Sequence, residues 1–260
     1  MRLFDAHNHF QDDRFDGRQE ELIANCTAVG VFRMVVNGTR ESDWPAVSAL
    51  AKRYDCVIPS FGLHPWFIHE RSTAWMAKLE QQLDIWPSAV GEFGLDRWKP
   101  GLDYAEQEEV FTAQLRLATD LNLPASIHCL KNWVRLHELI RTGPLPRRGF
   151  LLHSYGGPSE MVEPLARLGA YFSFPGAFAD KRKTRQQNAF RQIPADRLLI
   201  ETDAPDQPLP HDRVTHPLNQ EINHPANIAA VYEAAAQLLG QPTSDLANSV
   251  EENFIRLFGD

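Results

Sequence analysis

Two histidines stand one residue apart close to the start of the sequence, at His7 and His9 in the stretch LFDAHNHF. Residues i and i+2 of a strand point to the same face, so both imidazoles can reach a single metal ion. The alternative is two polar residues on an ordinary strand, because such a pair alone is a weak signal. The pair therefore predicts a metal site only if further donors join it.

Other residues of metal-binding type follow short apolar runs further along the chain. Glu92 lies in AVGEFGL, His128 ends PASIH, His153 ends FLLH and Asp203 lies in LLIETDAP. Each has an ordinary explanation: a buried ion pair for Glu92, satisfied core histidines, and a loop or helix cap for Asp203. Their recurrence at strand ends is harder to explain one by one, so jointly they predict a metal site. The predicted ligands are His7, His9, Glu92, His128, His153 and Asp203.

The elements that must position these side chains alternate between short apolar runs and longer helical patterns. We expect strands at residues 2–7, 32–38, 57–64, 89–95, 124–129, 150–155, 170–174 and 197–203. Clear helical patterns cover residues 18–30, 44–54, 105–122 and 159–169. Gly30 and Gly169 end two of these patterns, as C-terminal capping glycines do.

This alternation predicts βαβ units around a parallel sheet. Eight strands in 260 residues indicate an α/β fold, a (β/α)8 TIM barrel that forms a single domain over residues 1–260. A doubly wound open sheet is the alternative, but the sequence lacks the Gly-rich phosphate loop of that fold. In a barrel the carboxyl ends of the strands meet at one mouth, which would bring the predicted ligands together. The Pro-rich stretch 205–225 is predicted to be an active-site loop.

Composition and charge narrow the class of protein. The net charge of −8 argues against a broad basic face for nucleic acid. The three cysteines form no C-x-x-C and no disulfide framework, which is typical of a reducing compartment. Neither a signal peptide nor an apolar stretch of membrane-spanning length is present in the sequence. We expect a soluble cytoplasmic protein that needs no membrane and no obligate protein partner.

The predicted ligand set combines four imidazoles with two carboxylates and contains no thiolate. Such a set suits Zn²⁺, Mn²⁺ or Fe²⁺ and disfavours a closed structural zinc site, which usually recruits cysteine. Two ions about 3.5–4 Å apart, bridged by a carboxylate, would use all of the donors. We expect two divalent metal ions as cofactors, Zn²⁺ first, with Mg²⁺ or Mn²⁺ as alternatives.

Several motifs of the chain occur in the order found in TatD-like hydrolases, a branch of the metal-dependent amidohydrolase superfamily. They are DAHNH, GLHP, VGEFGLD, SIH, LLHSYGG and RLLIETDAP, and the resemblance runs from Leu3 to NFIRLF at 253–258. The resemblance implies a TIM barrel with a binuclear site and metal-dependent deoxyribonuclease activity. It implies one ion held by His7, His9, Glu92 and Asp203, and another held by Glu92, His128 and His153.

The same resemblance suggests roles for individual residues. Asp203 and Glu92 are the predicted catalytic carboxylates, with Asp203 accepting the proton of a metal-activated water. Glu201 lies two residues before Asp203 on the predicted strand and is assigned a supporting or substrate-orienting role, with a buried ion pair as the alternative. His64 in GLHPW resembles the substrate-contacting histidine of the family, with a purely structural loop role as the alternative. Trp66 beside it could stack on a base or simply pack.

Two departures from the family pattern bear on the substrate. Leu130 stands where TatD-like sequences often carry arginine, and INHP at 222–225 stands where they often read Arg-Asn-Glu-Pro. Both changes remove cations that could hold a phosphate. Lys131, the run 181–185 or His224 could compensate, although a charge run is more often a solvated helix face.

Three functions remain open on the sequence. The first is a binuclear TatD-type deoxyribonuclease or phosphodiesterase acting on DNA ends or a small phosphate ester. The second is a related hydrolase of a lactone, an amide or a small phosphate ester, which the loss of the two arginines favours slightly. The third is a non-catalytic metal-binding protein, which the complete ligand set disfavours.

Overall fold

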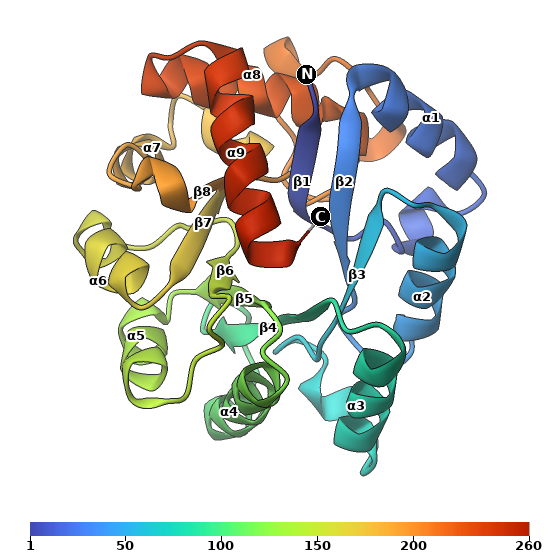
Figure 1. The fold of residues 1–260 in the computed structure, drawn as a ribbon, viewed down its shortest axis with the longest axis vertical. Coiled ribbons are helices and arrows are strands. Elements are labelled where there is room, and N and C mark those ends of the chain that lie inside the picture. Colours follow the sequence, from blue (N-terminus) through green and yellow to red (C-terminus); the bar gives the residue numbers. More distant parts are fainter. Residues whose placement is uncertain (260) are drawn as a thin grey trace.

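Eight parallel strands, paired in chain order, form a nearly closed ring with helices around it (Figure 1). This computed structural model describes residues 1–259, except for the side chain of Gln220. The strands are β1 (Leu3–Asn8), β2 (Val31–Asn37), β3 (Val57–Phe61), β4 (Ala89–Asp96), β5 (Ala125–Leu130), β6 (Phe150–Leu152), β7 (Ala170–Phe174) and β8 (Leu198–Ile200). The predicted (β/α)8 TIM barrel is confirmed.

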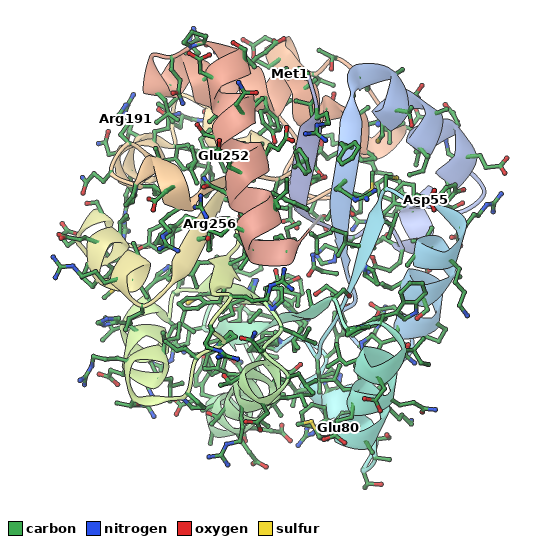
Figure 2. All side chains as sticks on the ribbon, viewed as in Figure 1. Met1, Asp55, Glu80, Arg191, Glu252 and Arg256 are labelled. Carbon is green, nitrogen blue, oxygen red and sulfur yellow. The ribbon has the colours of Figure 1, made fainter. Side chains whose placement is uncertain are left out.

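The helices follow the strands along the chain and cover the outside of the ring. They are α1 (Gln19–Val29), α2 (Trp44–Arg53), α3 (Trp75–Ile85), α4 (Tyr104–Asp120), α5 (Trp133–Thr142), α6 (Val162–Arg167), α7 (Thr184–Phe190), α8 (Ile228–Leu239) and α9 (Thr243–Phe258). The strands are almost wholly buried because helices cover them outside and side chains fill the ring inside. Charged side chains such as Asp55, Glu80 and Arg191 lie at the periphery (Figure 2).

The ring closes between β1 and the segment after β8 through both side-chain and backbone hydrogen bonds. The Asp5 carboxylate of β1 accepts hydrogen bonds from the backbone N–H of Thr202, at 2.9 Å, and from its hydroxyl, at 2.6 Å. One residue further on, the backbone N–H of Asp203 donates to the carbonyl of His7 at 2.9 Å. These bonds fix the segment after β8 against the end of β1, where the predicted ligands begin.

The amino end of the barrel is covered by α9, which lies across one end of the ring (Figure 1). The Asn253 side chain donates to the carbonyl of Leu198 at 2.9 Å, and the Phe254 ring packs on Phe4 with centroids 4.9 Å apart. The opposite end, where the strands finish, is left open for a site.

Three predicted strands end well before the residue that the sequence indicated. β3 ends at Phe61, β6 at Leu152 and β8 at Ile200, each three residues before the predicted end. In two of them the backbone turns away: Ser154 has φ 46° and Asp203 has φ 52°, and a left-handed residue cannot extend a strand. β4 instead runs on to Asp96, so Glu92 lies inside a strand rather than at its end.

Two glycines of β4 explain the close approach of the next strand. A Cβ atom on Gly94 would lie 1.9 Å from the carbonyl oxygen of His128, and one on Gly91 would lie 2.6 Å from the Ser126 side chain. Any larger residue would push β5 away, so the glycines on either side of Glu92 let the two strands place their side chains together.

The predicted active-site loop at 205–225 forms three short 3-10 turns and one bridge between Pro217 and Asn223. Of its described residues, Asp206 and Gln207 line the cavity at the open end of the barrel. Within residues 1–259, no helix has the combination of length and apolar composition that crossing a membrane requires.

Candidate metal centre

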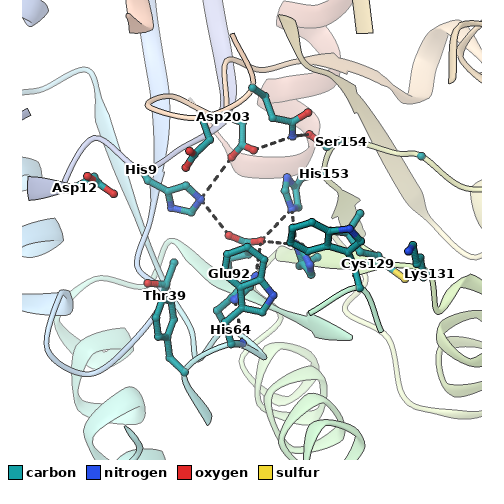
Figure 3. A pocket seen from close by; sticks show the side chains of 18 of the residues that line it. His9, Asp12, Thr39, His64, Glu92, Cys129, Lys131, His153, Ser154 and Asp203 are labelled. Atoms are coloured by element: carbon teal, nitrogen blue, oxygen red, sulfur yellow. Dashed lines mark hydrogen bonds and ion pairs between the residues drawn. The ribbon is translucent and has the colours of Figure 1, made fainter. Parts of the chain in front are cut away.

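A cavity of about 750 Å³ opens at the carboxyl ends of the strands. Its floor contains five of the side chains named from the sequence (Figure 3). They are His9, Glu92, His128, His153 and Asp203, with His64 beside them. His7 is fully buried behind this floor. The structure therefore brings together all six predicted ligands and His64.

Glu92 lies between two groups of imidazoles, and its Oε2 atom faces the first. This oxygen lies 3.3 Å from Nε2 of His7 and 3.2 Å from Nε2 of His9. Asp203 completes the group, with Oδ1 at 3.7 Å from Nε2 of His7 and 3.5 Å from Nε2 of His9. Two carboxylate oxygens and two imidazole nitrogens thus converge on one point.

The other oxygen of Glu92, Oε1, faces the second group. It lies 2.9 Å from Nε2 of His153, 3.0 Å from Nδ1 of His128 and 3.4 Å from Nε2 of His64. Figure 3 shows Glu92 between His9 and His153, with dashed lines reaching both sides. A single carboxylate therefore links two separate sets of nitrogen donors.

Some polar atoms of this floor lack partners of their own. Nε2 of His7 and Oδ1 of Asp203 are buried and have no hydrogen-bond partner among the described residues. A buried polar atom without a partner is costly, and native proteins rarely leave one unexplained. Both atoms lie in groups whose donors fall within 4.8 Å of one another. Those groups are His7, His153 and Asp203; His7, His9 and Glu92; and His64, Glu92 and His128. The donor set fits divalent cations.

Hydrogen bonds on the far side of each ring fix how these imidazoles point. Nδ1 of His7 lies 2.9 Å from the Ser126 hydroxyl, and Nδ1 of His9 donates to the carbonyl of Asn37 at 2.8 Å. Engaging Nδ1 in this way leaves Nε2 of each ring directed at the carboxylates, as in metal sites of other proteins.

Asp96 is a functional candidate that the sequence reasoning missed. Its Oδ2 atom lies 3.0 Å from Nε2 of His128, so Nδ1 of that ring faces Glu92. The same oxygen accepts a hydrogen bond from the Trp66 indole at 2.7 Å. The available signal was the last letter of VGEFGLD, a carboxylate that ends an apolar strand and is fully buried.

Glu201 lies under His153, though not for the reason expected. β8 ends at Ile200, so the argument that Glu201 and Asp203 share one face of a strand was wrong. Its carboxylate accepts hydrogen bonds from the hydroxyls of Ser154 and Ser173 and lies 3.8 Å from Nδ1 of His153. Its described partners are thus hydroxyls and a histidine, and no lysine or arginine forms the buried pair considered as an alternative.

Gln207 supports the other carboxylate of the floor. Its side-chain amide donates to Oδ2 of Asp203 at 2.8 Å and to the hydroxyl of Ser154 at 2.5 Å. Asp203 therefore has one oxygen held by an amide and the other directed, without a partner, toward the imidazoles. No sequence pattern indicated this role, because Gln207 lies in a long loop.

The floor is electrostatically prepared for positive charge. Burial alone would raise the pKa of Glu92, but the histidines around it, His153 first, hold that pKa well below its usual range. Burial likewise opposes ionisation of Asp203, yet the nearby imidazoles, His9 first, lower its pKa to about 2. Burial lowers the pKa of His64 to about 4. Although burial opposes it, the neighbouring carboxylates raise the pKa of His9, His128 and His153 above the usual value. The floor therefore favours bound positive charge, either as protons or as a divalent cation.

The residues considered as substitutes for the missing arginines fall in two places. Leu130, 37% exposed, lines the cavity together with Lys131, Lys183 and Arg185. His224 does not line it: its Nδ1 accepts the backbone N–H of Ala226, and its Nε2 lies 3.2 Å from the Asn25 amide. His224 was therefore the wrong substitute, because a bond to α1 holds it outside the cavity.

The chain matches the family described as TatD related DNase over residues 4–259. It is 32% identical to the 3'-5' ssDNA/RNA exonuclease TatD of Cronobacter sakazakii, over 98% of this chain and 97% of that protein. It is 28% identical to the uncharacterized metal-dependent hydrolase YjjV of Escherichia coli, over 99% and 98% of the two chains. The crystal structure of YjjV superposes with a TM-score of 0.92. The chain therefore belongs to the TatD-related DNase family, a family of hydrolases.

Proposed function

We propose that this protein is a two-metal phosphodiesterase that removes nucleotides from the ends of single-stranded nucleic acid. The proposal is based mainly on Glu92, because the two oxygens of its carboxylate face two different sets of imidazoles. Relatives named as single-strand exonucleases support the choice of substrate.

The proposed ion positions follow from the two sets of imidazoles on either side of Glu92. The first ion is held by His7, His9, Glu92 and Asp203, and the second by Glu92, His128 and His153. His64, whose Nε2 lies 3.4 Å from Glu92, is a further donor available on the second side. The absence of thiolate and the mixture of imidazole and carboxylate favour Zn²⁺ or Mn²⁺.

When bound, divalent cations at such a site polarise a phosphoryl oxygen and make a water molecule more acidic. The chain's own residues supply the rest. Asp203, with Oδ1 unpaired and Oδ2 held by Gln207, is the proposed acceptor of the proton from the attacking water. Asp96, 3.0 Å from Nε2 of His128, keeps that ring in place, which is a positioning role, and Glu201 places a carboxylate 3.8 Å from Nδ1 of His153.

The test compares the wild type with Asp203→Asn and with a matched control, Asp212→Asn. Asp212 lies in the same long loop, is exposed, and does not line the cavity. Each protein is loaded with Zn²⁺ or Mn²⁺, its bound metal is measured by mass spectrometry, and it is assayed on single-stranded oligonucleotides and on panels of lactones and amides.

We expect about two ions per wild-type chain and metal-dependent release of nucleotides by the wild type and Asp212→Asn. Asp203→Asn should lose that activity. Hydrolysis confined to lactones or amides would overturn the phosphodiesterase and support the alternative enzyme. Binding of less than one tight ion after loading would overturn the two-metal site.

A further inference from the structure

The indole of Trp98 is 56% exposed at the mouth of the cavity, where β4 passes into α4. A single exposed apolar side chain is ordinary on a protein surface. The surroundings of Trp98 are unusual, because neighbouring residues hold its indole over the opening that leads to the buried floor.

Trp66 lies beneath Trp98 in a nearly parallel orientation. The ring centroids are 6.3 Å apart and the planes differ by 28°. Nζ of Lys99 lies 4.7 Å from the centroid of the Trp66 ring, within the range of a cation–π contact. The two indoles therefore form a layered aromatic surface with a positive charge beside it, which we call the tryptophan pair.

One buried carboxylate fixes the tryptophan pair relative to the floor. Asp96 accepts the indole N–H of Trp66 at 2.7 Å through Oδ2, and the backbone N–H of Trp98 at 2.6 Å through Oδ1. The same Oδ2 lies 3.0 Å from Nε2 of His128. The side chain of Asp96 thus connects the tryptophan pair directly to a histidine of the candidate metal centre.

Charge is distributed unevenly around the mouth of the cavity. The loops after β8, β1 and β2 contribute the carboxylates Asp206, Asp12, Asp13 and Asp43. Arg14 on that arc forks between Asp12 and Asp206, so it is neutralised there. Arg40 on the same arc pairs with Glu70 at 3.4 Å. This arc repels a phosphate backbone.

The loops after β3, β4, β5 and β7 form the opposite arc, which carries the tryptophan pair and three cations that line the cavity. The cations are Lys131, Lys183 and Arg185, and none of them forms an ion pair with a described residue. Apart from the floor, no described residue that lines this arc is a carboxylate. An anionic strand leaving the floor is therefore directed over these loops.

We propose that the exposed face of Trp98 is a nucleobase subsite, on which a base of a single strand stacks while its phosphates pass Lys131, Lys183 and Arg185. This inference rests on the proposed function, in which the end of the strand reacts at the floor. An aromatic face beside unpaired cations is how proteins bind single strands without reading their sequence. A duplex is excluded because its bases are already stacked on one another.

The test measures binding rather than cleavage. A fluorescein-labelled hexathymidylate with phosphorothioate linkages, which slow hydrolysis, is titrated against the metal-loaded wild type, Trp98→Ala and Trp98→Phe. A second hexamer lacks its bases but keeps the backbone. Tyr104→Ala is the matched control, because Tyr104 is an aromatic residue 40% exposed near the same loop and does not line the cavity.

Trp98→Ala should bind the hexathymidylate about 5- to 100-fold more weakly and the abasic hexamer as well as the wild type does. Trp98→Phe should retain most of the affinity, and Tyr104→Ala all of it. Equal binding of hexathymidylate by the wild type and Trp98→Ala, or an equal loss on both hexamers, would overturn the subsite. Cleavage of an unmodified hexamer is measured in parallel, and its absence from the wild type would count against the proposed function alone.

Discussion

The floor and the rim of the cavity are built in opposite ways. At the floor, Glu92 is 2% exposed and has five imidazoles within 3.4 Å. At the rim, Trp98 is 56% exposed and Lys131 has no partner among the described residues. A buried carboxylate that is surrounded on all sides tolerates few substitutions around it, whereas an exposed loop residue tolerates many. Under the proposed function, the floor would carry out the reaction and the rim would select the substrate.

The largest effect should come from breaking the floor at its centre. Glu92→Gln removes the charge that links the two imidazole groups, so kcat on single-stranded DNA should fall at least about 1,000-fold. Bound metal should fall with it, as measured by mass spectrometry. Glu233→Gln, at an exposed position of α8, is the control and should behave as the wild type. A Glu92→Gln enzyme with normal metal content and activity would contradict the role of the floor.

Asp96→Asn should disturb the floor and the rim together. Loss of the charge that holds His128 should lower kcat about 10- to 100-fold, and loosening of Trp66 should raise KM. Trp66→Phe separates the two effects, because it removes one hydrogen bond to Asp96 and leaves the contact with His128. It should change KM more than kcat. Equal changes in kcat for the two variants would show that Asp96 does not act through His128.

Leu130→Arg should alter the rim and leave the floor unchanged. Leu130 is 37% exposed and lines the cavity, so an added guanidinium there can reach a phosphate. For a single strand, the slope of log K against log salt should steepen by about 0.7, with kcat unaffected. Val134→Arg, on α5 at 63% exposure and outside the cavity lining, is the control. An unchanged slope would place Leu130 off the path of the strand.

The smallest expected effect concerns the support beneath the floor. Asp5→Asn replaces an acceptor of the Thr202 N–H and hydroxyl, so one buried donor loses its partner. The free energy of unfolding should decrease by about 1–3 kcal/mol, measured by urea denaturation. Asp55→Asn, at an exposed position, should change it by less than about 0.5 kcal/mol. Equal stability of the two variants would show that Asp5 does not close the ring.

The floor was largely predictable because its residues obey short-range rules. β1 ends at Asn8, so His9 lies one residue beyond the strand, yet both His7 and His9 face Glu92 as their spacing predicted. Glu92 is a charge in an apolar run, which the sequence alone shows. The spacing of eight apolar runs likewise predicted the barrel. The same rules failed for Glu201, because the strand had already ended at Ile200.

The supporting contacts and the rim were not predictable. Asp96 of β4 contacts His128 of β5 and Trp66 of the loop after β3. Gln207 contacts Asp203 from within a long loop. Such contacts depend on how distant segments pack, and a loop's residue types say little about which way it folds. The residue type of His224 did not predict its position, because a bond to Asn25 holds it away from the cavity.

Anomalous diffraction from crystals loaded with Mn²⁺ would show whether Glu92 links two ions. We expect two peaks about 3.5–4 Å apart, one beside His7, His9 and Asp203 and the other beside His128 and His153. A single peak, or two peaks that Glu92 does not join, would contradict this role of Glu92.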